Sequence, residues 1–153
     1  HANLGALEQA RVELNAYDSK RFAELSIDEV RRQSDLSDAI AHFERAIVLD
    51  VANPTARQRL TEIHLARYEY DEALATIEPA WHAGYRDRVT RLLYADALVA
   101  AGRVDEAVAV IDGPSGEPEF ARDRLLGQAW SRYHQAGDAE REAWAYEAAD
   151  RLP

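Results

Sequence analysis

The chain has 153 residues, enough for one compact domain or a short array of repeats. Its formal net charge is -10 and no third of the sequence is basic, so nucleic acid and anionic membrane surfaces are not expected as partners. The absence of cysteine excludes a disulfide framework, a thiolate zinc site and a cysteine nucleophile. No apolar run approaches the roughly 20 residues of a membrane helix, so direct membrane insertion of this fragment is not expected.

Residues 1–19 are expected to form an N-terminal packing helix or a partial repeat. Apolar side chains recur there at helical spacing, so that one helix face would hold Leu7, Ala10, Leu14 and Tyr17. In one interpretation this helix packs on a repeat that begins near Lys20. In the other it is itself the first helix of the first repeat, and residues 18–33 are inserted before its partner. We favour the first interpretation, and the second stays open.

A capping box is predicted next, where Ser26 is followed three residues later by Glu29. In this pattern the serine hydroxyl accepts a hydrogen bond from a backbone N–H of the first helical turn. A helix is therefore expected to begin at Ile27.

A repeat of 34 residues runs through the rest of the chain. Its clearest copies are residues 35–40, 69–74 and 103–108, which align without gaps on Ala39, Ala73 and Ala107. A large apolar residue follows each alanine by four positions, and these residues are Phe43, Ile77 and Ile111. Because positions i and i+4 share one helix face, this pattern predicts two antiparallel helices that approach each other closely.

Another apolar stripe precedes each copy and predicts a second helix in every repeat. The stripes are Leu60, Ile63 and Ala66, then Leu93, Ala97 and Leu98, and in a fourth unit Leu126, Trp130 and Tyr133. Gly102 and Gly137 fit helix ends that turn through the left-handed conformation. Pro and Gly in residues 113–118 predict a loop that ends a helix after about two turns.

The pattern resembles the tetratricopeptide repeat, a helix pair with a small residue between its helices. The resemblance covers residues 20–153, with repeats at about 20–53, 54–87, 88–121 and 122–153. It implies an all-α fold, a right-handed α-α superhelix of helical hairpins whose first helices line a concave groove. The chain departs from the family where Ser34 and Tyr68 replace the glycine, and where Trp130 replaces a small residue.

If this geometry applies, the groove is lined from the first helices. The predicted lining is Thr55, Gln58, Glu62, Leu65, Val89, Leu92, Asp96, Val99, Arg124, Ser131 and His134. Family members that clamp a peptide's terminal carboxylates use lysines and asparagines at places that here hold Gln58, Glu62, Leu92 and Asp96. We therefore expect no carboxylate clamp, and apolar anchors around Leu92 and Val99.

No catalytic, cofactor-binding or metal-binding residues are predicted. The 7 glycines are dispersed rather than gathered in a phosphate-binding loop, and the 5 histidines lack the three or four converging ligands of a metal site. Acidic pairs such as Asp71 and Glu72 stand at expected helix starts, where carboxylates favour the helix dipole. No serine has a recognisable nucleophile motif. An enzyme is therefore not expected.

The expected function is a non-catalytic protein–protein interaction scaffold that binds a peptide or protein segment in its groove. The alternative is an accessory or regulatory domain of a larger bacterial membrane or cell-envelope protein, since a chain that starts at His1 without methionine resembles a fragment. A soluble fragment is expected, and a cytoplasmic or extracytoplasmic location stays open. Self-association is also considered, because a short helix stack exposes an apolar end unless it is capped.

Overall fold

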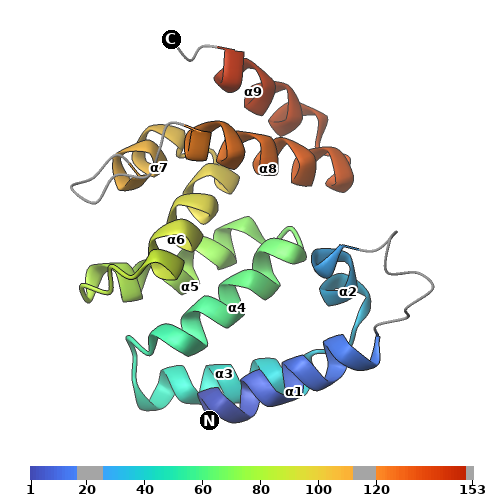
Figure 1. The fold of residues 1–153 in the computed structure, drawn as a ribbon, viewed down its shortest axis with the longest axis vertical. Coiled ribbons are helices and arrows are strands. Elements are labelled where there is room, and N and C mark those ends of the chain that lie inside the picture. Colours follow the sequence, from blue (N-terminus) through green and yellow to red (C-terminus); the bar gives the residue numbers. More distant parts are fainter. Residues whose placement is uncertain (17–25, 112–119, 151–153) are drawn as a thin grey trace.

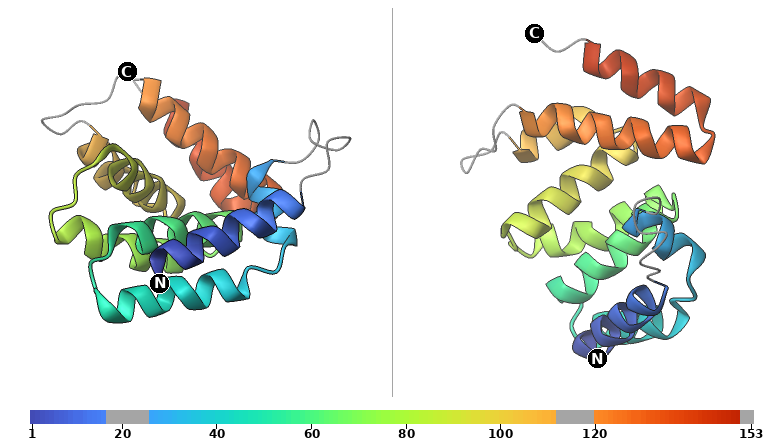
Figure 2. Two further views of the ribbon diagram at one scale, coloured as in Figure 1. Left: turned by 60° about the horizontal axis from the view of Figure 1, so that its bottom comes forward. Right: turned by 45° about the vertical axis from the view of Figure 1, so that its right-hand side comes forward.

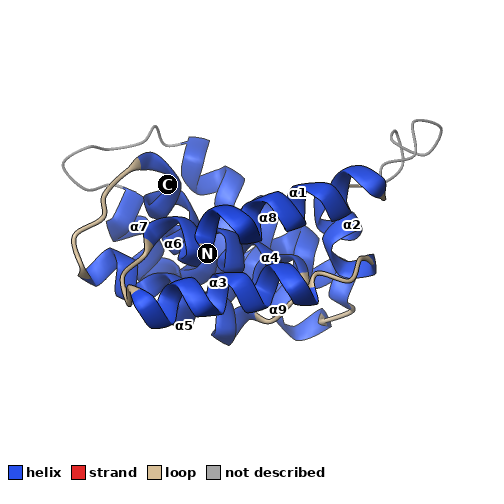
Figure 3. Ribbon diagram, turned by 90° about the horizontal axis from the view of Figure 1, so that it is seen from below, coloured by secondary structure: helices blue, strands red, loops and turns tan. Residues whose placement is uncertain are grey.

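The computed structural model describes residues 1–16, 26–111 and 120–150, and within these ranges every regular element is a helix (Figures 1 and 3). The all-α class expected from the sequence is therefore confirmed for the part of the chain that is described. The helices are α1 (Ala2–Asn15), α2 (Ile27–Gln33), α3 (Ser37–Leu49), α4 (Pro54–Ala66), α5 (Tyr70–His82), α6 (Arg88–Ala100), α7 (Val104–Ile111), α8 (Phe120–Ala136) and α9 (Ala139–Asp150).

The helices pack in successive pairs, with α1 against α3, α4 against α5, α6 against α7 and α8 against α9. The first helices of these pairs also contact one another in series, from α1 to α4, α6 and α8. Within the described residues, the second helices α3, α5, α7 and α9 make no such contacts with one another. The first helices therefore form one continuous row, which runs through the molecule in Figure 1.

The first pair differs from the others because its two helices are separated by an insertion that contains α2. It is α1 that packs along α3, whereas α2 contacts α4 and α1. Gly5 explains the close approach of α1, since a Cβ there would lie 2.6 Å from Phe43 Cε1 and 3.1 Å from the Ala39 carbonyl oxygen. Helix α1 is therefore the packing partner of α3, although α2 stands between them in the sequence.

The repeating alanine and large residue lie in the interior, as their spacing predicted. Ala39, Ala73 and Ala107 are at most 1% exposed, and Phe43, Ile77 and Ile111 are equally buried. They belong to two clusters of buried apolar side chains, one among α1, α3 and α4 and a larger one from α4 to α9. Small residues at helix crossings let the neighbouring large side chains fill the remaining space.

The turn between the two helices of each later pair contains a residue with left-handed backbone conformation. Gly102 and Gly137 have φ values of +81° and +72°, as predicted for helix ends of this kind. The equivalent residue in the second pair is Tyr68, whose φ is +65°. A side chain in this conformation costs roughly 1–2 kcal/mol, so a tyrosine here points to a role for its ring.

Three further sequence expectations have distinct outcomes. Ser26 caps α2, because its hydroxyl accepts a hydrogen bond from the Glu29 backbone N–H at 3.2 Å. The loop expected at residues 113–118 lies outside the described residues. No helix in the described ranges is long and apolar enough to cross a bilayer.

Candidate functional site

Charged side chains from five helices meet on the face of the first-helix row that α2 covers. We call this group the inner-face network, and its members are Glu13 of α1, Asp28 and Arg31 of α2, Glu62 of α4, Asp96 of α6 and Arg132 of α8. Helix α2 lies between the side formed by α1 and α4 and the C-terminal end of α8, as Figure 2 shows from two directions.

Arg31 joins three helices on one side of the network. Its Nε lies 2.8 Å from Glu13 Oε1 and its Nη2 lies 3.1 Å from Glu62 Oε2. The same guanidinium is 3.8 Å from Asp28, one helical turn earlier on α2. The Arg31 side chain is 11% exposed and those of Glu13, Glu62 and Asp28 are 17%, 23% and 31% exposed, so these ion pairs remain in contact with solvent and with dissolved salt.

Arg132 is the centre of the other side of the network. Its Nη1 lies 2.6 Å from Asp96 Oδ1, and its Nη2 lies 3.9 Å from Asp28 Oδ2. Burial acts to lower the pKa of the Arg132 guanidinium, but the charge and hydrogen bond of Asp96 outweigh it and the pKa is raised. Arg132 therefore stays charged and offers one edge of its guanidinium to α2.

The position of Arg132 is fixed by the residue next to it. The Tyr133 hydroxyl donates to the carbonyl oxygens of Val99 and Ala100, at 3.0 and 2.6 Å, and so binds α8 to the end of α6. Asp96 belongs to a stretch of α6 that is otherwise apolar and buried. A carboxylate in such surroundings requires a charged partner, which Arg132 supplies.

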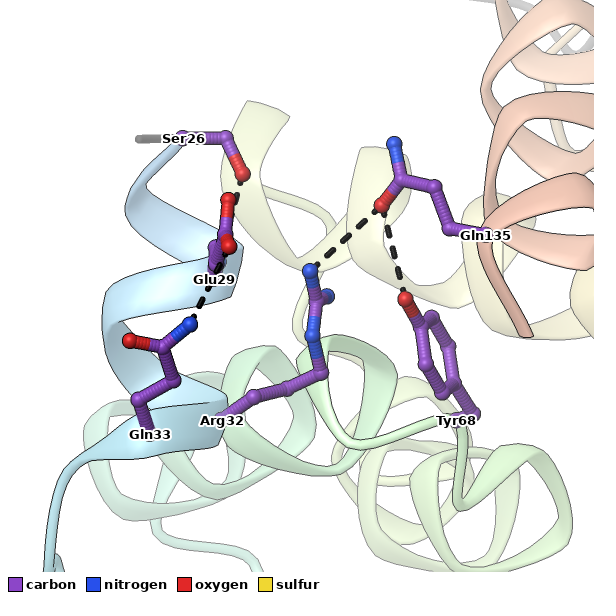
Figure 4. Close-up of a pocket in the computed structure, with 6 residues that line it drawn as sticks. All are labelled: Ser26, Glu29, Arg32, Gln33, Tyr68 and Gln135. Carbon is purple, nitrogen blue, oxygen red and sulfur yellow. Dashed lines mark hydrogen bonds between the residues drawn. The ribbon is translucent and has the colours of Figure 1, made fainter. Parts of the chain in front are cut away.

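A pocket of about 580 Å³ opens beside the network, between α2, the turn after α4 and the end of α8 (Figure 4). Arg32 crosses it, with Cζ 4.8 Å from the centre of the Tyr68 ring and Nη1 donating to the Ala66 carbonyl oxygen at 3.0 Å. The Tyr68 hydroxyl donates to Gln135 Oε1 at 3.4 Å. The lining residues are Ser26, Glu29, Arg32, Gln33, Tyr68 and Gln135.

Tyr70 is buried in the same region, and the pKa of its phenol is raised above the ordinary value of 10. Burial raises the pKa of its phenol to about 12, against the opposing effect of the Arg132 charge. Its ring meets Tyr133 edge-on, with centroids 5.4 Å apart. Tyr70 therefore stays neutral at physiological pH, and its ring packs against that of Tyr133, the residue next to Arg132.

The residues predicted to line the groove are distributed over several environments. Leu65 and Val99 are 1% exposed and belong to the core, so their side chains are closed to a ligand. Asp96 and Glu62 both belong to the inner-face network, where they pair with different arginines, whereas Gln58 donates to Thr90 at 2.8 Å. The remaining lining residues are Leu92 and Ser131, which are half-buried, and Thr55, Val89 and His134, which are exposed; the Arg124 side chain lies outside the described part of the chain.

Sequence reasoning missed most of the network because α2 interrupts the regular repeat. Glu13, Asp28, Arg31 and Arg132 were not among the predicted lining residues. One signal was present, since Tyr68 replaces the glycine expected at its turn and its ring packs against Arg32. A bulky residue at a turn where glycine is expected indicates that its side chain makes a specific contact.

The described residues hold no group of three His, Asp or Glu side chains placed to bind a metal ion. The contacts observed at the site are ion pairs, a guanidinium–aromatic contact and amide hydrogen bonds. A comparison of the chain with family models, curated proteins and solved structures gave no match.

Proposed function

We propose that the chain is a short right-handed superhelix of the tetratricopeptide type and a non-catalytic scaffold whose inner face binds a peptide or protein segment. The inner face is the side of α4, α6 and α8 that carries Glu62, Asp96 and Arg132. The 34-residue repeat and the continuous row of first helices support this architecture.

One observation carries the proposal, which is that the inner face already holds a short helix through polar contacts. No residue of α2 is buried, yet Arg31 and Asp28 form ion pairs with α1, α4 and α8. A face that receives one short charged segment in this way suits the recognition of another. Charges placed on rigid helices fix the orientation and register of such a segment.

Site-specific photocrosslinking tests the proposal. A photoreactive amino acid at Ser131 or Thr55 would probe the first helices, and the same group at Ala75 or Ala109, which are exposed on α5 and α7, is the matched control. In cells that express the chain, we expect a discrete crosslinked protein from the first-helix positions only. Equal crosslinking from both sets, or none from the first helices, would contradict a binding face on that side.

A further inference from the structure

Among the described helices, α2 is the one that has no buried residue. It has seven residues, and its Ile27 side chain is 51% exposed. An isolated helix of this length is unstable in water, so its helical form depends on the surface against which it packs. We call this surface the α2 seat, and it consists of Glu13, Glu62, Ala66, Tyr68 and Arg132. That seat supplies mainly charged and hydrogen-bonding partners.

Charged groups at the seat also have ion-pair partners outside α2. Glu62 lies 3.3 Å from Arg59, and Arg132 lies 2.6 Å from Asp96. Departure of α2 would therefore leave few uncompensated charges. A binding site whose own groups are held in place is preorganised for a ligand and tolerates exchange of one ligand for another.

The positions of the charges define what the seat accepts. Glu13 and Glu62 receive the guanidinium of Arg31, and Arg132 receives the carboxylate of Asp28. Asp28 and Arg31 are three residues apart on one helix, so the seat is complementary to a carboxylate one turn before an arginine.

The following residue completes the pattern with a second guanidinium. Arg32 lies over the ring of Tyr68 and donates to the carbonyl oxygen of Ala66 at the end of α4. The left-handed backbone of Tyr68 places this ring at the seat, where the corresponding turns in later pairs have Gly102 and Gly137. A second arginine adjacent to the first therefore contributes to recognition.

We propose that α2 is an internal ligand of the inner face, and that the external partner is a short helical segment with the same charges, an acidic residue three positions before a pair of arginines. This rests on the proposed function of the inner face as a binding surface. The partner and α2 would compete for Glu13, Glu62 and Arg132, so the chain binds the partner only when α2 is displaced.

A labelled peptide of residues 26–34 tests the proposal by fluorescence anisotropy. The full chain is compared with the variant Asp28→Arg/Arg31→Asp, in which α2 no longer matches its seat but the net charge is unchanged. Glu44→Arg/Arg45→Glu, an equivalent exchange at exposed positions of α3, is the control. We expect the peptide to bind the α2 variant at least about tenfold more tightly than the wild type and the control, because the apparent affinity scales with the fraction of open sites.

A second peptide with Asp28 and Arg31 exchanged should not bind any of the three chains. Equal affinity for the wild-type and variant chains, or no binding to either, would overturn the proposal. Exchange of α2 between two copies would also overturn it, and light scattering would reveal this as a mass that increases with concentration. Should the double exchange unfold the chain, the milder variant Asp28→Asn/Arg31→Gln carries the same expectation.

Failure of this experiment is distinguishable from failure of the scaffold proposal. If the peptide does not bind but Ser131 crosslinks to a cellular protein, the inner face binds a partner of different chemistry and only the internal-ligand proposal is lost. If both experiments fail, the binding function itself is contradicted.

Discussion

Helix α4 takes part in two interfaces that are built from different contacts. In the interface with α5, Leu65 of α4 is 1% exposed and belongs to the same buried apolar cluster as Ala73 and Ile77 of α5, which are 0% exposed. Towards α2 it presents Glu62 and a terminal carbonyl oxygen, which pair with arginines. Apolar burial is strong and non-directional, whereas ion pairs are weaker and depend on position. The comparison indicates that the helix pairs supply stability and that the α2 seat supplies recognition.

The largest expected effect is in the apolar interface. Ile77→Ala removes a fully buried side chain between α5 and its neighbours, and should lower the free energy of unfolding by about 3 kcal/mol. Urea denaturation followed by circular dichroism measures this. The control Val48→Ala changes a side chain that is 68% exposed and should stay within about 0.5 kcal/mol of the wild type. Similar losses in both variants would show that α5 is not held by its apolar face.

The next effect concerns the ion pair between Arg132 and Asp96 in the inner-face network. Arg132→Gln leaves Asp96 in an apolar helix without its charged partner, and should lower the free energy of unfolding by about 2 kcal/mol. The double variant Arg132→Gln/Asp96→Asn should recover part of that loss, since no charge is then left unpaired. Additive losses in the double variant would mean that the two side chains do not interact.

A smaller effect tests the packing of the first pair. Gly5→Ala should destabilise the chain by about 1.5 kcal/mol, because the added Cβ would meet the Phe43 ring at 2.6 Å. Gly127 lies in α8, where an added Cβ would meet no neighbouring helix within 4 Å, and Gly127→Ala should stabilise the chain by up to about 1 kcal/mol through helix propensity. Thermal unfolding of both variants gives the comparison, and a stabilising Gly5→Ala would contradict the contact between α1 and α3.

The smallest effect is local and depends on pH. Burial acts to raise the pKa of Asp87, but hydrogen bonds from Thr90 and Val89 outweigh it and the pKa is lowered from its usual 3.8. The stabilisation from this N-cap of α6 is therefore complete above pH 3.8 and is lost as the pH falls through the lowered value. Asp87→Ala should lower the free energy of unfolding by about 1 kcal/mol at neutral pH. Chemical denaturation at neutral and acidic pH should show the variant and wild type converging in acid.

The sequence allowed the helix pairs to be predicted because apolar spacing is a local signal. Ala73 and Ile77 share a face through the geometry of one helix, so a spacing of four positions is enough to show it. Gly102 likewise indicates a turn, because glycine adopts a positive φ without steric cost. These predictions needed no knowledge of which helices become neighbours.

The inner-face network could not be predicted in the same way. Asp28 and Arg132 are separated by most of the chain and meet only because α2 lies across the first-helix row. An insertion at residues 18–33 is one interpretation of the repeat pattern, but a local pattern does not determine where an inserted helix packs. Val99, expected as an anchor for a ligand, is turned into the core because α6 is buried on several sides. Tyr68 was noted as a departure, and its contact with Arg32 gives that departure a physical reason.

The most direct test of the difference between the two interfaces is amide hydrogen exchange as a function of salt. Between about 0.1 M and 1 M salt the Debye length falls from roughly 10 Å to roughly 3 Å, which weakens ion pairs and leaves apolar contacts intact. We predict that residues 27–33 of α2 lose protection over this range while residues 70–82 of α5 keep theirs. Protection of α2 that is independent of salt, or equal to that of α5, would contradict a seat held by charge.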